Sequence, residues 1–351
     1  MDFRFTEEQE MTAEAVQGLL ADLCTPADLR RLMAEGRPRD TGRWARIVEM
    51  GLAGALVPEA QGGLGLAPVD FVQVAEACGR ACLPEPLVEN AGVAVPLLAA
   101  AAPHAPALAE ALGGALTVAV SHPANPFVAD ADTAGALVLE RGGALWLVRP
   151  ERARLTAQPS SDPFRRLFTV AFDENHAERI AAPAEAEALL AGALDRGALF
   201  TAAQHLGIAQ AAVELAVAYA KERQQFGKPI GSYQAVKHLL ANAQVKIGFA
   251  RPVVHAAAAM APQGDAFSRA RISHARLAAA GAADLATRTA IQVHGAMGYS
   301  WEVDVHFFLK RSIALASWWG TPAFHRHRVA ARVLAGPLGP DHTFATEAQD
   351  A

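Results

Sequence analysis

The chain has 351 residues, a length sufficient for two or three domains with a sizeable core. Apolar residues make up 52% of it, its formal net charge is −5 and it has no basic block, which argues against nucleic acid as a partner. Three cysteines without metal-ligand spacing predict a reducing compartment, no disulfide framework and no metal site. The N-terminus is acidic and polar and the apolar runs are interrupted, so we predict a cytoplasmic protein without a membrane span.

Residues 1–112 are predicted to form an N-terminal helical domain. Thr6 precedes an acidic stretch, which is typical of an N-cap followed by the first turn of a helix. A second helix is expected to begin near Met50 and to end in a Pro/Gly loop before Gly65. Apolar periodicity then predicts a helix over Pro68–Arg80.

Residues 113–182 are predicted to form a small β domain. Short apolar or alternating runs are separated there by Gly, Pro, Asp and Asn. These runs predict four or five strands, so the β domain is expected to be reduced in size. Trp146 lies in one of the runs and is predicted to belong to the strand core.

Residues 183–338 are predicted to form a helical bundle, followed by a loose tail over 339–351. Helical periodicity extends over 184–223, and an unbroken helix of that length would reach roughly 60 Å. Because this exceeds the diameter of a domain, we expect a bend or break near 205–207. Further helices are predicted at Ser232–Ala261, Asp265–Val293, Val303–Leu315 and Ala323–Leu334.

Two motifs occur where these helices end. The first, at residues 219–241, reads YAKERQQFGKPIGSYQAVKHLLA, with a tight turn between two helices. Within it, the guanidinium of Arg223 presents a fork of donors suited to phosphate oxygens, and Phe226 offers a flat face to an aromatic ring system. The alternative is a solvated helix C-terminus, where arginine and lysine are common.

The second motif, at residues 292–302, reads QVHGAMGYSWE and ends a helix at small residues. Gln292 can present its amide to an adenosine, and Gly295 lets a backbone approach a cofactor closely. No strand precedes the motif, so it is not a Rossmann fingerprint. His294 is predicted to be structural.

With these motifs the chain resembles the flavin-dependent acyl-CoA dehydrogenases over most of its length. The resemblance implies a mainly α fold with a small β domain: an N-terminal helical domain, a reduced middle β domain and a C-terminal four-helix bundle. It also implies an acyl-CoA substrate, FAD shared at a subunit interface and an electron-transfer flavoprotein as electron acceptor. In the family, the residues matching Arg223 and Phe226 reach the FAD of a neighbouring subunit. The same resemblance places Gln292, Gly295 and Thr321 among the cofactor-binding residues.

The usual catalytic base of the family is missing. Many members carry it in a Tyr-Glu-Gly-Thr segment, where this chain has Trp318, Trp319, Gly320 and Thr321. Trp319 cannot abstract a proton. Other members place the base early in the bundle, before an arginine, and Asp195 and Arg196 match those two positions. Asp195 is therefore a candidate base and Arg196 a candidate active-site arginine; alternatively, Asp195 begins the helix or pairs with a neighbouring cation.

A cofactor loop is missing as well. Members that hold FAD outright carry a Thr-Glu-Pro-Gly-Ala-Gly-Ser-Asp-like loop in the middle domain, which this chain lacks. The chain thus keeps the FAD contacts that a subunit gives to its neighbour and lacks those that it keeps for itself. We predict the shorter subunit of a heteromeric α2β2 acyl-CoA dehydrogenase for steroid side-chain or other bulky acyl-CoA thioesters. Its longer paralogous subunit would supply most of the flavin pocket and the base.

Three alternatives remain open at this point. The first is a self-sufficient homo-oligomeric acyl-CoA dehydrogenase that uses Asp195 as its base. The second is a different flavin reaction on the same fold, such as that of a monooxygenase or a nitroalkane oxidase. The third is a non-catalytic scaffold subunit that stabilises or regulates a partner.

Overall fold

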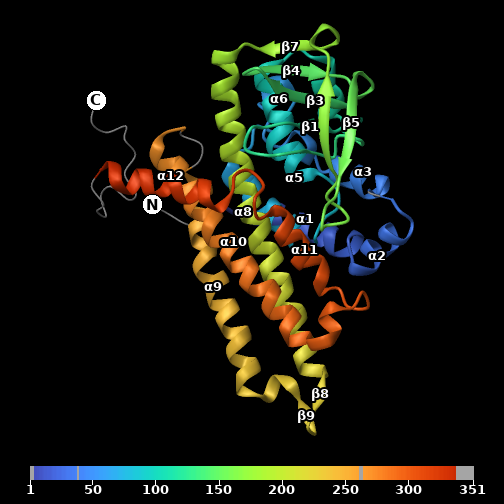
Figure 1. Cartoon of the computed structure of the whole chain (residues 1–351), viewed down its shortest axis with the longest axis vertical. Coiled ribbons are helices and arrows are strands. Elements are labelled where there is room, and N and C mark those ends of the chain that lie inside the picture. Colours follow the sequence, from blue (N-terminus) through green and yellow to red (C-terminus); the bar gives the residue numbers. More distant parts are fainter. Residues whose placement is uncertain (1–3, 38, 261–263, 337–351) are drawn as a thin grey trace.

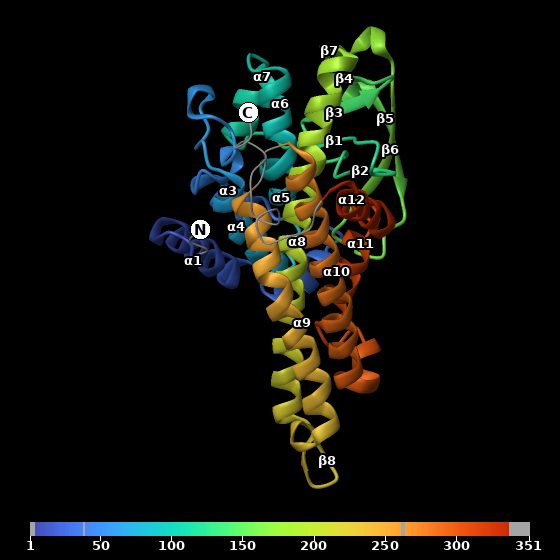
Figure 2. The same cartoon turned by 90° about the vertical axis from the view of Figure 1, so that its left-hand side faces the viewer.

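The computed structural model of the chain describes residues 4–37, 39–260 and 264–336 (Figure 1). Long helices run along its vertical axis, the strands lie beside their upper part, and a small hairpin forms the lower tip (Figures 1 and 2). The prediction of a mainly helical chain with a small β region is confirmed. Within the described ranges, no helix is long and apolar enough to cross a membrane. The tail predicted at 339–351 lies outside these ranges, and the division into three domains stays a prediction.

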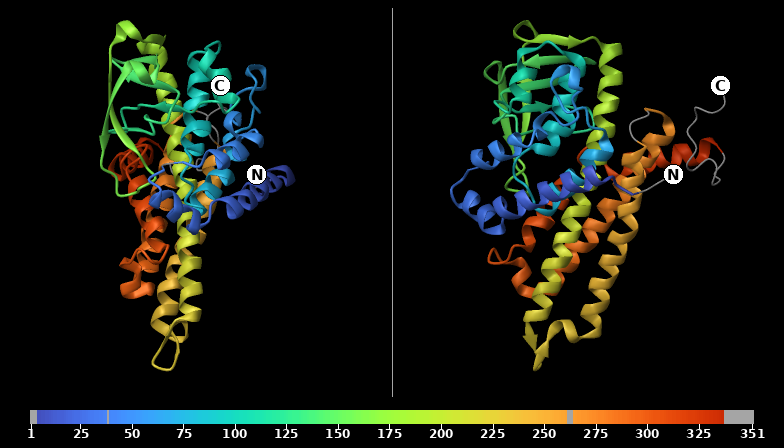
Figure 3. Two further views of the ribbon diagram at one scale, coloured as in Figure 1. Left: turned by 90° about the vertical axis from the view of Figure 1, so that its right-hand side faces the viewer. Right: turned by 180° about the vertical axis from the view of Figure 1, so that it is seen from behind.

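Short helices make up the N-terminal part of the chain, and seen from behind they lie across the long helices (Figure 3). Thr6 caps the first of them as predicted: its Oγ1 accepts from the Gln9 N–H at 3.3 Å, and its own N–H donates to Gln9 Oε1 at 2.9 Å. The prediction of a helix beginning near Met50 is wrong. Gly51 and Gly62 adopt left-handed φ angles, and only two 3₁₀ turns form there. The elements are α1 (Glu7–Leu23), α2 (Pro26–Ala34), α3 (Thr41–Glu49), η1 (Leu52–Gly54), η2 (Glu59–Gln61), α4 (Pro68–Arg80), α5 (Leu87–Glu89), the π-helical η3 (Asn90–Ala94), α6 (Val95–Ala101) and α7 (Pro106–Leu112).

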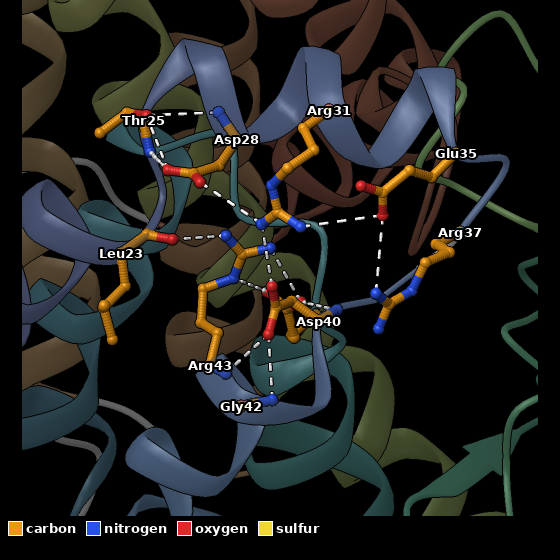
Figure 4. A network of polar contacts seen from close by, with 10 residues as sticks. Leu23, Thr25, Asp28, Arg31, Glu35, Arg37, Asp40, Gly42 and Arg43 are labelled. Carbon is orange, nitrogen blue, oxygen red and sulfur yellow. Dashed lines mark hydrogen bonds and ion pairs between the residues drawn. The ribbon is translucent and has the colours of Figure 1, made fainter.

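A buried ion pair joins these first helices to the segment after α4. Arg43 donates to both carboxylate oxygens of Glu85, from Nε at 2.6 Å and from Nη2 at 3.0 Å, and its Nη1 donates to the Leu23 carbonyl oxygen at 2.6 Å. Asp40 caps α3 by accepting from the N–H groups of Gly42 and Arg43 (Figure 4). One guanidinium therefore fixes the end of α1, the start of α3 and the chain entering α5 relative to one another.

Two small sheets occupy residues 113–182, all of which the structure describes. They contain seven strands, so the predicted number of four or five was too low. One sheet has the order β1-β3-β4-β7, with β1 and β3 parallel, and the other is antiparallel with the order β2-β6-β5. Leu137 and Leu139 pack between the sheets, whereas Val138 faces the main core, because side chains alternate along a strand. Trp146 packs against the cluster between the sheets. The strands are β1 (Val118–Val120), β2 (Val128–Ala129), β3 (Ala136–Arg141), β4 (Ala144–Val148), β5 (Ala153–Gln158), β6 (Leu167–Phe172) and β7 (Glu178–Ala181).

One helix, α8, runs through the centre of the bundle (Figure 1). It is unbroken over its 40 residues, so the predicted bend or break near 205–207 is wrong. Every residue from 197 to 209 is buried, because other elements surround this part of the helix on all sides. The other predicted helices are present within a few residues of the expected bounds. The elements are α8 (Pro183–Glu222), β8 (Gln224–Gln225), β9 (Lys228–Pro229), η6 (Ile230–Ser232), α9 (Gln234–Ala259), α10 (Ala266–His294), η7 (Gly295–Tyr299), α11 (Val305–Leu315) and α12 (Pro322–Ala335).

A close contact between α4 and α8 depends on Gly207. A Cβ atom at this position would lie 1.9 Å from the carbonyl oxygen of Glu76 and 2.5 Å from the backbone nitrogen of Arg80. Gly207→Ala is therefore expected to push the helices apart and to lower the free energy of unfolding by about 1–3 kcal/mol, measured by urea denaturation. The control is Gly248→Ala on α9, where a Cβ meets nothing within 4 Å and a gain of about 0.4–1 kcal/mol is expected. Equal effects of the two substitutions would contradict this role of the contact.

Candidate functional site

The hairpin after α8 carries Arg223 and Phe226 at the lower tip of the molecule (Figure 1). The Arg223 carbonyl oxygen accepts from the Ile230 N–H at 2.8 Å, and within the described ranges its guanidinium forms no ion pair. Phe226 is 92% exposed with a φ of +53°, and Gly227 follows at +79°. A two-residue hairpin turn of the primed type requires two such angles, and a phenylalanine adopts one at a cost of about 1–3 kcal/mol. An aromatic ring held outward at that cost indicates a contact surface.

The second motif lies beside the first. The Tyr219 ring, in the last turn of α8, stacks on His294 at the end of α10 with ring centroids 4.3 Å apart. His294 is buried and its Nδ1 lies 2.7 Å from the Ala290 carbonyl oxygen, in agreement with the predicted structural role. Gln292 and Gly295 are exposed at the same end. Gly295 has a φ of +61°, and a Cβ on it would meet no atom within 4 Å, so open space lies above its backbone.

Asp195 lies at a different level of the bundle. It lies roughly 40 Å from Arg223 along α8, at a rise of about 1.5 Å per residue. The residue is 2% exposed; Arg328 Nη2 donates to Oδ1 at 2.9 Å and Arg269 Nε donates to Oδ2 at 3.1 Å. Both oxygens have cationic partners, which favours the alternative that Asp195 pairs with neighbouring cations. Its role as a base stays a prediction.

Arg196 and Thr321 lie at the same end as Asp195. Burial lowers the pKa of the Arg196 guanidinium to about 10, and the carboxylate of Asp195 opposes this shift, so the group is charged at neutral pH. Arg196 Nε is buried without a hydrogen-bond partner in the described part of the chain. Thr321 caps α12, its Oγ1 accepting from the Phe324 N–H at 3.2 Å. Their predicted roles stay predictions, but neither lies with Arg223.

A buried cluster around Trp319 contains residues that the sequence did not indicate. The indole Nε1 of Trp319 donates to Glu89 Oε2 at 2.9 Å, and Arg165 Nη2 lies 3.2 Å from Glu89 Oε1. The Arg165 guanidinium also lies over the Trp318 ring, 4.2 Å from its centroid. Glu89 comes from α5, more than 200 positions away along the chain, so no local pattern could have connected it with Trp319.

The long helical bundle and the small β region are those of a flavin-dependent dehydrogenase of the acyl-CoA dehydrogenase type. Two family models match the chain, described as acyl-CoA dehydrogenase, N-terminal domain, over residues 6–105 and acyl-CoA dehydrogenase, C-terminal domain, over residues 188–334. The chain is 36% identical over 337 residues to acyl-CoA dehydrogenase IpdE2 of Mycobacterium tuberculosis, covering 94% of this chain and 99% of that protein. The chain belongs to the acyl-CoA dehydrogenase family.

Solved structures share this fold along nearly the whole chain. One is the ChsE4-ChsE5 complex of Mycobacterium tuberculosis, with a TM-score of 0.80 and 21% identity over 96% of this chain and 100% of that one. Another is the Tcur3481-Tcur3483 steroid acyl-CoA dehydrogenase in a G363A variant, with a TM-score of 0.81 and 22% identity over 94% of this chain and 98% of that one. At these identities the likeness shows the fold alone.

As a member of this family the protein is an FAD-dependent oxidoreductase with acyl-CoA dehydrogenase activity. When bound, FAD supplies the acceptor for the hydride removed from the thioester. The exposed residues fit part of such a cofactor: the Arg223 guanidinium forms no ion pair with a described residue, Phe226 has an exposed ring, and Gly295 has an open backbone with Gln292 nearby in the chain. Two cavities that Glu89 lines among the described residues have volumes of about 10 and 20 Å³ and are too small for such a cofactor.

Proposed function

We propose that this chain is the half-site subunit of a heteromeric α2β2 acyl-CoA dehydrogenase, with a longer paralogous subunit as its partner. The observation that carries the proposal is the exposure of Arg223, Phe226, Gln292 and Gly295 at one end of the bundle. These residues would hold the pyrophosphate and adenosine of an FAD whose flavin ring lies mainly in the partner. FAD is thus shared at the subunit interface.

The unequal sharing of the cofactor explains why two kinds of subunit are needed. A homo-oligomer needs both halves of the FAD site in every chain, and this chain has lost the middle-domain cofactor loop. The catalytic base is likewise missing from this chain. Trp319 stands in place of the glutamate, and the Asp195 carboxylate already accepts from Arg269 and Arg328. The partner therefore supplies the glutamate that takes the α-proton of the thioester.

Bulky acyl-CoA thioesters, including steroid-derived ones, are the substrates that we propose. Support comes from the likeness to structures of a two-component complex and of a steroid acyl-CoA dehydrogenase. The products are an α,β-unsaturated thioester and reduced flavin. An electron-transfer flavoprotein takes up the electrons.

The chain purified alone is expected to be colourless, whereas the complex co-expressed with its longer paralogue is expected to be yellow. The reason is that the donated contacts reach only part of the cofactor. The visible spectrum and the mass in solution of both preparations measure the flavin per chain and the subunit ratio. A flavin content of about one FAD per chain without the partner would overturn the proposal and favour the self-sufficient enzyme.

Activity of the two preparations separates the remaining alternatives. Dehydrogenation of an acyl-CoA is expected only from the complex. A partner that remains fully active without this chain would identify a non-catalytic scaffold. Oxygen-dependent turnover by the complex without an enoyl thioester product would instead indicate a different flavin reaction.

A further inference from the structure

Trp319 lies in the interior of the chain, at the sequence position that by the family resemblance matches the catalytic glutamate of many members. Trp319 is 1% exposed, and its backbone has a φ of +56°, a conformation that is rare for a bulky residue. The next residue, Gly320, has a φ of +103°. Such a backbone persists only where the surroundings hold it in place.

Contacts from several parts of the chain hold Trp319. Its backbone N–H donates to Asn125 Oδ1 at 2.7 Å, and its carbonyl oxygen lies 3.0 Å from His325 Nε2. Its indole N–H donates to Glu89, and the His122 ring lies 5.4 Å away between centroids. The N-terminal helices, the β region and the end of the bundle therefore all meet at this one residue.

The central helix is shaped to receive the indole. A Cβ atom on Gly197 of α8 would lie 2.2 Å from Cδ2 and 2.5 Å from Cγ and Cε2 of Trp319. Gly197 is buried, and it follows Asp195 and Arg196, which match family active-site positions. The smallest residue thus faces the largest one, a complementary pair in a close-packed interior.

Two small cavities lie beside Glu89, the hydrogen-bond partner of the indole. Their volumes are about 10 and 20 Å³; Trp318 also lines the smaller cavity, and Arg165 also lines the larger one. A cavity of this size holds about one water molecule, whereas pockets for organic ligands measure roughly 300–1,000 Å³. Neither of these two cavities, as the described residues form them, can therefore hold an acyl chain.

We infer that Trp319 is a plug that seals this chain's own acyl pocket and excludes the thioester. A base must lie within hydrogen-bond reach of the α-proton, so an acyl chain would have to pass the position that the indole fills. Combined with the proposed function, on which this step rests, the plug leaves one thioester site for each pair of unlike subunits. That site lies in the partner.

Removal of the plug is expected to create a binding site for free indole. In the full chain, Trp319→Gly should lower the melting temperature, and added indole should raise it again and bind saturably in calorimetry. N-methylindole, which cannot donate to Glu89, should bind roughly tenfold to a hundredfold more weakly. Trp301→Gly is the matched control: Trp301 is 58% exposed, so its removal leaves no enclosed cavity and indole should not raise the melting temperature of this variant.

Two further measurements keep the inference open to refutation if Trp319→Gly does not fold. Gly197→Ala should expel the indole, because its Cβ would overlap the ring, and the tryptophan emission should shift to longer wavelength. The wild-type chain should bind neither indole nor decanoyl-CoA. A folded Trp319→Gly variant that ignores indole, a Gly197→Ala variant without an emission shift, or saturable decanoyl-CoA binding by the wild-type chain would each overturn it.

The proposal for Trp319 and the half-site proposal can be refuted independently of each other. The indole experiment uses this chain without a partner, so its result does not depend on which subunit holds the flavin. A chain that is yellow alone would refute the half-site proposal but would leave the indole result standing.

Discussion

Asp195→Asn is expected to lower the free energy of unfolding by about 3 kcal/mol. The substitution keeps the size of the side chain but removes the negative charge between Arg269 and Arg328. Loss of one partner of a buried ion pair costs about 3–5 kcal/mol, because the remaining charge loses its compensation. The lower end applies here because the Arg269 side chain is 37% exposed and can turn to water, whereas that of Arg328 is only 17% exposed. Urea denaturation of the two chains measures the difference.

Asp284→Asn is the matched control for this variant. Asp284 pairs with Arg288 one turn away on α10, and both side chains are more than half exposed. A surface pair of this kind contributes at most about 1 kcal/mol, so the control should be nearly neutral. Equal losses for Asp195→Asn and Asp284→Asn would show that burial does not strengthen the Asp195 pairs.

The same variant tests the alternative in which Asp195 is the base. A general base contributes about 10²–10⁴-fold to the rate, so its loss would lower kcat of the complex by that factor while the flavin remains bound. If Asp195 only holds Arg269 and Arg328, kcat per folded complex should change little at a temperature where the variant is folded. A large fall in kcat at full flavin content would revive Asp195 as the base and count against the partner's glutamate.

The two motifs were predictable because each is a local pattern with a local cause. The FGKPIG turn follows from adjacent residues, and it forms a hairpin with positive φ angles at Phe226 and Gly227. The end of α10 at Gly295 follows equally from glycine's freedom of φ. The sequence did not indicate whether Asp195 is buried, because its two arginine partners come from α10 and α12 and are far from it along the chain.

The misses have the opposite cause, since they depend on packing between distant segments. The predicted break near Gly207 assumed that a helix longer than a domain must bend, whereas contact with Glu76 and Arg80 on α4 makes use of the missing side chain. The sequence showed that Trp319 replaces the glutamate, but it did not show that Trp319 contacts Gly197 and Glu89. These are contacts across many residues, where a periodic pattern in one segment carries no information about the other.

Arg223→Ala is expected to weaken FAD binding to the assembled complex by roughly tenfold to a hundredfold. The guanidinium is exposed and has no ion pair within the described ranges, so it is available to the pyrophosphate. A hydrogen bond between charged groups contributes about 1.5–3 kcal/mol, which corresponds to that range of dissociation constants. Equilibrium dialysis of the complex co-expressed with its longer paralogue measures the constant. The dissociation constant of Arg223→Lys should lie between those of the wild-type complex and Arg223→Ala, because lysine keeps the charge but lacks the fork of donors.

Arg154→Ala on β5 is the matched control for the charge itself. Arg154 is exposed on the strand region, far along the chain from the hairpin, and forms no ion pair with a described residue. Because long-range attraction between exposed charges is screened at physiological salt, its loss should leave the dissociation constant unchanged within about twofold. Equal weakening by Arg154→Ala would mean that net charge, not contact, governs the affinity. An unchanged constant for Arg223→Ala would remove the contact on which the donated half of the FAD site depends, and the exposed, strained Phe226 would then need a different partner to explain it.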